Sequence, residues 1–537
     1  DTLGARPGQV VVAKIVIEPT KRQSPVGKIT EILGQSGAPG MATEIAIRSH
    51  GLPFEWPEGV EAEAEAYGES VPEEMKTGRK DYRDLPLVTI DGADARDFDD
   101  AVYARKQNKG WRLIVAIAEV SAYVKPGGNL DDEAVVRSTS VYFPSRVIPM
   151  LPEALSNGLC SLKPAVDRLC LACEMTVSDD GTVQRSRFVA AVMKSSARLT
   201  YQQVADYFEN GKLKHHDDLA DVKKSLDDLY SLYQALAAAR LKRGAIGFES
   251  IEYGFQFDQR GAVTGLIAQE RNDAHKLIEE CMILANVQAA RFLLKNKLPA
   301  PYRVHASPPE SKLEALKQFL HGQGLQVPWH DDPQPKDFEK VVLQAQGRPD
   351  EHLIMAVLLR SQSLAAYQPG NEGHFGLALD AYTHFTSPIR RYPDLLVHRA
   401  IHHLLQRADK SRYPYNEEMM AELCARSSFN SRRAEEAERD VIDRLKCAYL
   451  ENHIGEEYEG LVSGVTSFGL FVELDYGRIS GLVHVTGLPN DYYHFDPVAH
   501  RMKGERRGRV FQLADRVKVR VVAVNLDERK IDFELAE

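Results

Sequence analysis

Hydrophobic positions follow two different periods along this chain of 537 residues. From Leu85 to about Val192 the apolar residues form short runs rich in β-branched side chains, which predicts strands separated by turns. From Tyr201 to Arg243 the apolar spacing becomes helical, and helical segments continue to about Asn452. We therefore interpret Asp81–Asn452 as one large α+β domain.

Both ends of the chain show a different pattern, in which short strands are separated by glycine and proline turns. We expect strands around Gln9–Ile17, Val26–Leu33 and Met41–Ile47, which are part of a small β-barrel and too few to close one. After Tyr458 the spacing predicts a complete OB-type barrel. Its expected strands are Gly460–Val465, Gly469–Leu474, Gly481–Val485, Arg516–Val524 and Lys530–Leu535.

A charged linker joins the first barrel to the large domain. It is acidic at Glu58–Glu74 and basic at Lys76–Lys80. We therefore expect a partial barrel and linker over 1–75, the large domain over 76–456 and the second barrel over 457–537.

Composition changes this picture little. Hydrophobic residues make up 43% and charged residues 27% of the chain, as in an ordinary soluble protein. The six cysteines follow no disulfide framework, which favours a reducing, cytoplasmic compartment. Because there is neither a secretion signal nor an apolar run long enough for a bilayer, we expect no membrane partner. The net charge of −10 opposes nucleic-acid binding as a sum, but a basic groove can coexist with an acidic exterior.

The densest cluster of charge follows the predicted strand Leu87–Ile90 directly. It consists of Asp91, Asp94, Asp97, Asp99 and Asp100. Carboxylates this close repel one another, so they need a cation unless all of them face water. Mg²⁺ or Mn²⁺ would suit these hard oxygen ligands, and the pattern predicts metal-dependent phosphodiester chemistry. The alternative is a solvated Asp-rich turn. Phe98 inside the cluster and the return to an apolar strand at Ala101 favour a loop pinned at a sheet edge.

Other segments carry weaker signals. Arg390 and Arg391, after a Ser-Pro turn, resemble a phosphate clamp, although a helix N-terminal turn with surface arginines explains the spacing equally well. His398 and His402 lack the glutamate of a zincin motif, so we interpret them as structural. One stripe of the helix predicted from Arg271 to Phe292 is polar, which is typical of a solvent face and leaves a substrate-binding role open. The stripe contains Asn272, His275, Glu279 and Asn286.

The last barrel carries aromatic residues beside glycine. Phe468, Phe471 and His484 fall on or beside adjacent predicted strands, where exposed rings can stack on bases. The alternative is an ordinary aromatic core, which Gly469 between the two phenylalanines makes weaker. The basic run Arg501–Arg509 can hold a nucleic-acid backbone.

Taken together and in this order, six motifs resemble the catalytic domain of the ribonuclease II superfamily, and within it the branch of bacterial ribonuclease R. They are Thr89–Asp100, Thr139–Pro144, Ile148–Pro152, Arg271-Asn272, Ser387–Tyr392 and Ala437–Asp440. The resemblance implies processive 3′-to-5′ hydrolysis of RNA to nucleoside 5′-monophosphates. It also implies cold-shock barrels before the catalytic domain and an S1-type barrel after it.

The same resemblance implies roles for individual residues. Asp91, Asp97 and Asp100 would be metal ligands, and Asp99, also at the metal, would be the aspartate most critical to turnover. Asp94 has no counterpart with a catalytic role. Arg390 would stabilise charge on the scissile phosphate.

RNA binding would involve further residues. Arg391 and Glu438 would lie near the phosphates, while Tyr142 and Phe248 would clamp the terminal bases between their rings. We expect a monomer whose partner is RNA with a single-stranded 3′ end. Two alternatives stay open: an enzyme like ribonuclease II that duplexes halt, and an RNA-binding protein that has kept the fold and lost catalysis.

Overall fold

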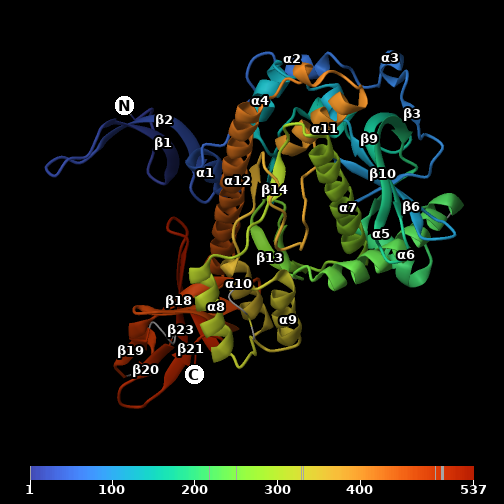
Figure 1. Ribbon diagram of the computed structural model, residues 1–537. Helices are drawn as coiled ribbons and strands as arrows, with labels where there is room; N and C mark the ends of the chain where they lie inside the picture. Colours follow the sequence, from blue (N-terminus) through green and yellow to red (C-terminus); the bar gives the residue numbers. More distant parts are fainter. Residues whose placement is uncertain are drawn as a thin grey trace.

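The computed structural model describes residues 2–216, 218–248, 251–327, 329, 332–489, 491–496 and 501–536 (Figure 1). Its centre is a seven-stranded sheet with the order β11-β4-β5-β6-β9-β10-β3. The strands are β3 Lys80–Asp81, β4 Val88–Asp91, β5 Asp100–Lys106, β6 Trp111–Ala118, β9 Asp167–Val177, β10 Val183–Lys194 and β11 Ala197–Thr200. The strand-rich pattern predicted up to Val192 is thus confirmed. Among the described strands of this sheet, only the β4–β11 and β3–β10 pairs are parallel.

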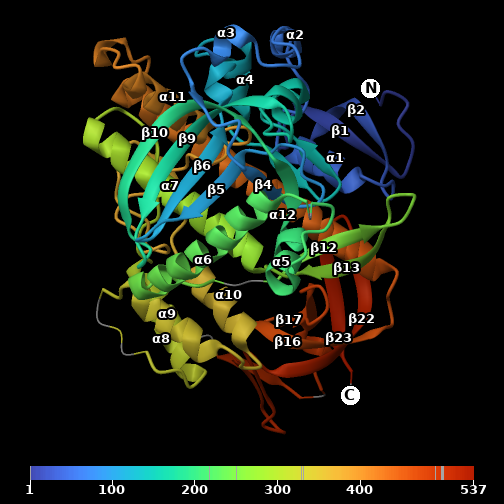
Figure 2. The same cartoon turned by 90° about the vertical axis from the view of Figure 1, so that its right-hand side faces the viewer.

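Helices pack on this sheet and bury its apolar residues. Helix α6 contacts β5, α7 contacts β6 and α11 contacts β10, and together they enclose the largest hydrophobic core. Figure 2 shows α6 crossing the end of the sheet. The helices of this layer are α5 Tyr201–Asn210, α6 Ala220–Arg243, α7 Asp273–Asn296 and α11 Tyr392–Leu405.

The smaller elements of the domain surround this core. The remaining helices are α2 Val60–Glu65, α3 Glu73–Lys76, α4 Asn129–Arg137, α8 Glu310–Gly322, α9 Pro335–Ala345 and α10 Glu351–Ser361. Three two-stranded pairs complete it: β7 Val141–Phe143 with β8 Arg146–Ile148, β12 Glu252–Phe257 with β13 Val263–Gln269, and β14 Tyr302–Val304 with β15 Ala366–Gln368. Helices thus dominate the region from Tyr201 to Asn452, as predicted, with short strands between them.

Helix α12, Glu417–Glu451, runs from the large domain to the last barrel. Its 35 residues make it about 50 Å long. Asn416 caps its first turn by accepting a hydrogen bond from the Met419 N–H at 2.8 Å. No helix among the described residues is long and apolar enough to cross a membrane.

The N-terminal segment departs from the prediction at its third element. β1 Gln9–Ile17 and β2 Val26–Gln35 form the expected antiparallel ribbon, but Met41–Ser49 is the helix α1 and not a strand. Gly40, with φ of 79°, lets the chain turn into this helix. The apolar residues then fall on one helical face, which packs against α12. In so short a segment the spacing of apolar residues did not distinguish the period of a helix from that of a strand.

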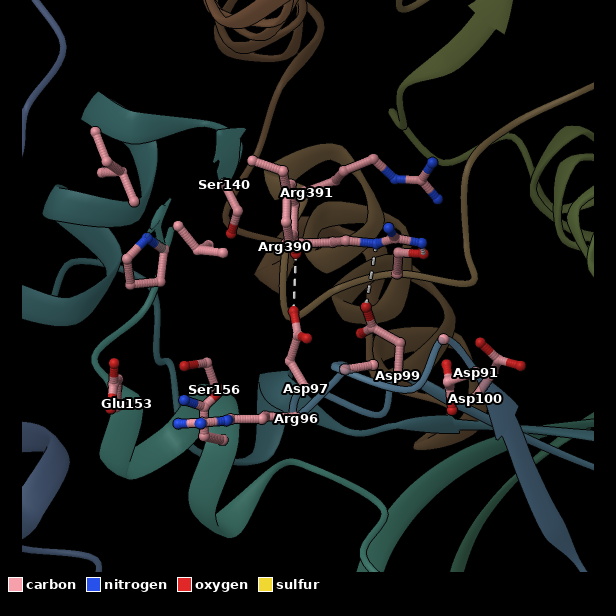
Figure 3. Close-up of a pocket in the computed structure, with 18 of the residues that line it drawn as sticks. Asp91, Arg96, Asp97, Asp99, Asp100, Ser140, Glu153, Ser156, Arg390 and Arg391 are labelled. Atoms are coloured by element: carbon pink, nitrogen blue, oxygen red, sulfur yellow. Dashed lines mark hydrogen bonds and ion pairs between the residues drawn. The ribbon is translucent and has the colours of Figure 1, made fainter. Parts of the chain in front are cut away.

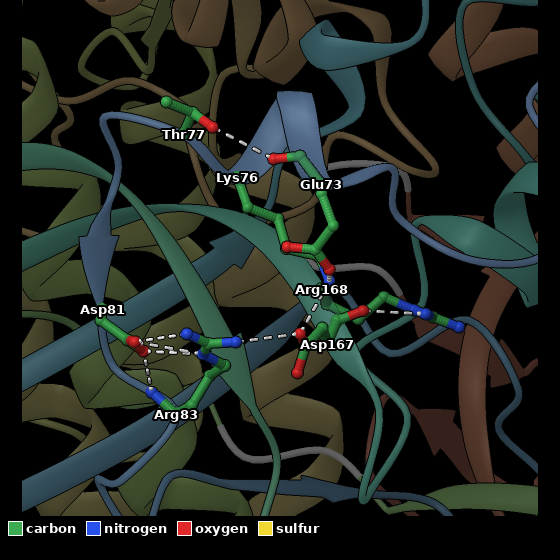
Figure 4. Close-up of polar contacts among 7 residues, drawn as sticks. All are labelled: Glu73, Lys76, Thr77, Asp81, Arg83, Asp167 and Arg168. Carbon is green, nitrogen blue, oxygen red and sulfur yellow. Dashed lines mark hydrogen bonds and ion pairs between the residues drawn. The ribbon is translucent and has the colours of Figure 1, made fainter.

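The charged linker is also more ordered than expected. Val60, Ala64 and Val71 are buried in the main core. Figure 4 shows how the basic part is fixed: Lys76 Nζ lies 2.9 Å from an Asp167 carboxylate oxygen, which Arg83 also contacts at 3.3 Å. These ion pairs attach the segment to the start of β9.

The last barrel closes as predicted, in the order β16-β17-β18-β23-β22. Its strands are β16 Glu457–Thr466, β17 Gly469–Leu474, β18 Ser480–His484, β22 Arg516–Asn525 and β23 Lys530–Leu535. A small second sheet precedes β22 and consists of β19 Tyr493–Asp496, β20 Arg501–Gly504 and β21 Val510–Gln512. The β12–β13 hairpin packs on this barrel, where the Leu266 N–H donates to the Tyr476 hydroxyl at 3.0 Å.

Candidate active site

The aspartate loop is held between two strands of the central sheet. β4 ends at Asp91 and β5 begins at Asp100, so the loop leaves and re-enters the sheet at one edge. Phe98 is buried, and its N–H donates to the Ser161 hydroxyl at 3.0 Å. Asp99 is only 4% exposed. The loop is therefore pinned, as Phe98 suggested, and it is not a solvated turn.

The second motif approaches this loop from a distant part of the chain. The Ile389 N–H donates to Asp99 Oδ1 at 2.9 Å, and Arg390 Nε lies 3.5 Å from Asp99 Oδ2 (Figure 3). The Arg390 carbonyl in turn accepts a hydrogen bond from the Ser140 N–H at 3.0 Å. The Ser-Pro segment thus presents one arginine directly to the most buried aspartate.

These groups line one pocket of about 1360 Å³. Of the predicted residues it contains Asp91, Asp97, Asp99, Asp100, Tyr142, Arg390 and Arg391. Asp94 also lines it, but its side chain is exposed. The Arg390 side chain is 47% exposed although protein atoms surround it, as expected for a group on the wall of a large open cavity.

The carboxylates in this pocket are poorly satisfied. Burial and the neighbouring Asp99 charge raise the pKa of Asp91, and burial together with Asp91 raises that of Asp100. Burial alone is the main reason why the pKa of Asp99 is raised. Asp91 Oδ2 and Asp99 Oδ2 are buried without any hydrogen-bond partner. Such a site favours a cation, since a positive charge would keep all the carboxylates ionised.

The donor set fits a hard divalent ion. It consists of carboxylate oxygens, two of which are buried and accept no hydrogen bond, and Mg²⁺ or Mn²⁺ prefers such ligands. Among the described residues no three acidic, histidine or cysteine side chains converge closely enough to hold a metal by themselves. Mg²⁺ commonly keeps several waters and binds substrate phosphate, so this arrangement suits a site that the substrate completes.

Arg391 takes part in a different interaction from Arg390. Its guanidinium pairs with both carboxylate oxygens of Asp394, at 2.8 and 2.9 Å. α11 starts at the next residue, Tyr392. The backbone here therefore forms the helix N-terminal turn that the alternative interpretation predicted. Both arginines nevertheless line the pocket, which a pair of surface arginines would not do.

Tyr142 links the aspartates to α12. Its hydroxyl donates to Asp97 Oδ2 at 2.8 Å, and its N–H donates to Glu438 Oε1 at 2.7 Å. Burial raises the pKa of Glu438. Glu438 therefore contacts the Tyr142 backbone, which places the ring at the wall of the pocket.

Phe248 lies elsewhere. It packs against the cluster formed by α8, α9 and α10, which includes Ile246 and Phe338, and it is not among the described residues that line the pocket. The structure thus does not bring Phe248 to Tyr142, and the expected clamp of two rings is not formed. The physical reason is the apolar packing against this cluster, which holds this end of the segment away from the aspartates. The next two residues, 249–250, lie outside the described part of the chain.

The aromatic residues of the last barrel do come together. Gly469 and His484 are paired in register between β17 and β18, and the Phe468 and Phe471 ring centroids are 6.1 Å apart. Phe468 is 47% exposed, which excludes a core position for it. These residues form a surface on the barrel, separate from the residues that line the central pocket.

The polar stripe of α7 is not a solvent face. Asn272 and His275 form a capping box. The His275 ring stacks on the Tyr201 ring, with 3.8 Å between the ring centroids. Asn286 is buried and accepts a hydrogen bond from the Phe385 N–H at 2.8 Å. Glu279 lines the pocket and pairs with Arg240 at 3.0 Å.

Tyr201 and His384 are among the pocket residues that had no individual signal in the sequence. Tyr201 begins α5 directly after β11, the strand that pairs with β4. His384 lies just before the Ser-Pro motif and contacts the Tyr367 hydroxyl at 2.6 Å through Nδ1. Burial keeps the pKa of His384 well below its usual range. Only its position within the motif could have indicated His384.

Comparison with known proteins agrees with this geometry. A model of the RNB domain matches residues 79–407, a cold shock domain matches 1–57 and an S1 RNA binding domain matches 451–536. Ribonuclease R of Aquifex aeolicus is 40% identical over 99% of this chain and 75% of its own length. The chain belongs to the ribonuclease R family. Its fold is accordingly an α+β RNB domain between a cold shock and an S1 domain.

Other members of the ribonuclease R family extend the comparison. The Escherichia coli protein is 51% identical over 99% of this chain, which spans 66% of the length of that relative. The apo structure of Mycoplasma genitalium RNase R matches with a TM-score of 0.94 and 27% identity, and the match covers 99% of this chain and 83% of that one. The same Mycoplasma protein has been solved with ribose methylated single-stranded RNA and with double-stranded RNA.

Proposed function

We propose that this chain is a processive 3′-to-5′ exoribonuclease that hydrolyses RNA to nucleoside 5′-monophosphates and a very short end product. Its substrates are single-stranded RNA and structured RNA with a 3′ overhang. The observation that carries this proposal is the position of Asp99, buried between the Ile389 N–H and Arg390 with further carboxylates in the same pocket. The RNA complexes of the Mycoplasma relative support RNA as the substrate.

The metal would be bound by the aspartates. Asp91, Asp97, Asp99 and Asp100 are the residues that would hold Mg²⁺, with Mn²⁺ as a substitute. When bound, the ion supplies an activated water and neutralises the leaving 3′ oxygen. The unsatisfied oxygens of Asp91 and Asp99 support this assignment.

The remaining residues position and stabilise the RNA. Arg390 presents a fixed positive charge 3.5 Å from Asp99, where charge develops on the scissile phosphate. Arg391, held by Asp394, contributes a second charge nearby. The Tyr142 ring stacks on a base without reading its sequence, and Glu438 fixes its backbone. Hydrolysis therefore depends on Asp99 and Arg390, whereas Tyr142 holds the strand between successive steps.

The S1 barrel would provide a further contact to RNA. Phe468, Phe471 and His484 form a surface on which bases can stack, and the basic residues of the β20–β21 region can contact the backbone. Because this surface lies outside the pocket, it would affect RNA affinity more than the chemical step.

An enzyme like ribonuclease II, which duplexes halt, is the main alternative. The test is a hairpin with a 3′ single-stranded overhang, incubated with Mg²⁺ and without ATP beside a blunt hairpin. We expect digestion through the overhang-bearing stem to very short oligonucleotides and little digestion of the blunt one. Each opened base-pair step costs about 1–2 kcal/mol by analogy with DNA stacking. A stop several nucleotides before the stem would support the alternative.

A catalytically silent RNA-binding protein is the second alternative. The pocket argues against it, because a protein without catalysis gains nothing from buried, mutually repelling carboxylates. Release of labelled mononucleotide from single-stranded RNA, stopped by EDTA, distinguishes the two.

A further inference from the structure

A second groove lies outside the central pocket, between α1, the loop that follows it and α12. Its volume is about 550 Å³. Two large apolar side chains remain uncovered there: Phe429 of α12 is 59% exposed and Val136 is 45% exposed. An aromatic ring this exposed on a helix surface costs free energy unless a ligand covers it.

The charges beside this ring are positive and have no acidic partner. Arg426 lies one turn before Phe429 and forms no hydrogen bond or ion pair with the described residues. The Arg433 guanidinium carbon is 5.8 Å from the Phe429 ring centre, and its Nε is buried without a partner. None of the described residues that line the groove is acidic. Arg48, on the opposite wall, differs because Glu31 and Glu44 neutralise it.

These residues share one face of α12. Positions 426, 429 and 433 follow the helical spacing that aligns side chains along one face. Arg433 Nη1 donates to the Gly51 carbonyl at 3.1 Å, but neither Arg426 nor Arg433 pairs with an acidic side chain. A stacking ring between two such arginines is a combination that can bind a base together with its flanking phosphates. In a chain with net charge −10, a groove whose described lining has arginines and no acidic residue favours an anionic ligand.

The groove also borders the central pocket. Phe54 lines both of them. Along α12, Phe429 and Glu438 are nine positions apart, which is about 13 Å, and Glu438 contacts the Tyr142 backbone. A strand whose 3′ end occupies the pocket could therefore extend into the groove within a few nucleotides.

We propose that this groove is a second binding site for the same RNA strand, upstream of the nucleotides in the central pocket. A base stacks on Phe429, while Arg426 and Arg433 contact the adjacent phosphates. An acidic peptide would share the charge complementarity, but the position of the groove beside the central pocket favours RNA. This inference rests on the proposed function, because it needs RNA in the central pocket.

Binding of two RNA lengths tests the proposal. The full chain in EDTA is titrated with labelled single strands of about 5 and about 20 nucleotides, of which only the longer reaches beyond the pocket. Phe429→Ala should raise the Kd of the long strand at least about fivefold and leave that of the short strand unchanged. Arg426→Gln with Arg433→Gln should reduce the slope of log Kd against log salt by about 1.4.

The control is Arg432→Gln, which removes an exposed arginine from the next face of the same helix. It should leave the long-strand Kd and the hydrolysis of the short strand as they are in the unmodified chain. An unchanged long-strand Kd in Phe429→Ala overturns the proposal, as does an equal loss for both lengths. If the unmodified chain binds neither length, the proposed function itself fails, which is a different result.

Discussion

Two buried carboxylates, Glu119 and Asp99, lie close together in this molecule but differ in how fully they are hydrogen-bonded. Glu119 follows β6, and the Ala118 N–H before it donates to the Asp99 carbonyl at 2.8 Å. Arg79 contacts both Glu119 oxygens, and His402 lies 2.6 Å from Oε1. Asp99, in contrast, has a buried oxygen without a hydrogen bond.

The pKa shifts follow this difference. Burial alone would raise the pKa of Glu119, but the hydrogen bonds from His402 and Arg79 outweigh it and leave that pKa lowered. For Asp99 burial dominates and the pKa is raised. A buried carboxylate with a complete set of partners stabilises the fold, whereas one with an incomplete set is available to a ligand.

Among variants that leave the aspartates of the pocket in place, the largest effect should come from removing the Arg390 guanidinium beside Asp99. In Arg390→Ala the transition state loses a fixed positive charge, so kcat should fall by about 10²–10³. Stability should change little, because the Arg390 side chain is solvent-accessible. Single-turnover hydrolysis of labelled RNA measures the rate, with Arg96→Ala as the control for an exposed arginine at the same pocket. A normal rate in Arg390→Ala would contradict the assigned role.

Replacing Glu119 should have the reverse effect of replacing Arg390: stability should fall and the rate of hydrolysis should change little. Glu119→Gln leaves Arg79 and His402 without their negative partner, which should lower the free energy of unfolding by about 3 kcal/mol. Urea denaturation measures this loss, and kcat of the folded protein should remain near that of the unmodified chain. A stable but inactive variant would place Glu119 in the catalytic machinery.

The pH dependence of unfolding provides the control for Glu119→Gln. Because the folded pKa of Glu119 is lowered, its stabilisation is present above the unfolded pKa of about 4.3 and is lost as pH falls through the folded value. The stability difference between Glu119→Gln and the unmodified chain should therefore shrink below about pH 4.

The smallest expected effect on the rate of hydrolysis is that of removing the Tyr142 ring at the pocket wall. Tyr142→Ala removes a stacking surface worth about 1–3 kcal/mol per base, so short products should dissociate earlier and the end product should lengthen. Tyr142→Phe keeps the ring and loses only the hydrogen bond to Asp97, so it should retain the original end product. Gel analysis of the limit digest compares them. The same end product in Tyr142→Ala would show that its ring does not hold RNA.

The sequence predicted the parts of this site that lie close together in the chain. The aspartates after β4 and the Ser-Pro-Ile-Arg-Arg segment could be recognised because each is a local pattern. It could not predict that His402 pairs with Glu119 across 283 positions, since such a contact depends on how α11 packs. The motif resemblance associated Phe248 with Tyr142, but apolar packing places it against the cluster of α8, α9 and α10.

The most direct test of this account is Asp99→Asn. Turnover and RNA affinity are measured together on 5′-labelled single-stranded RNA with Mg²⁺, beside the unmodified chain with and without EDTA. We predict that hydrolysis falls at least about a thousandfold, as it does in EDTA, while Kd stays within a few-fold because the stacking and arginine contacts remain. Binding lost in parallel with activity, or hydrolysis that continues without Asp99, would contradict the assignment of this pocket as the catalytic centre.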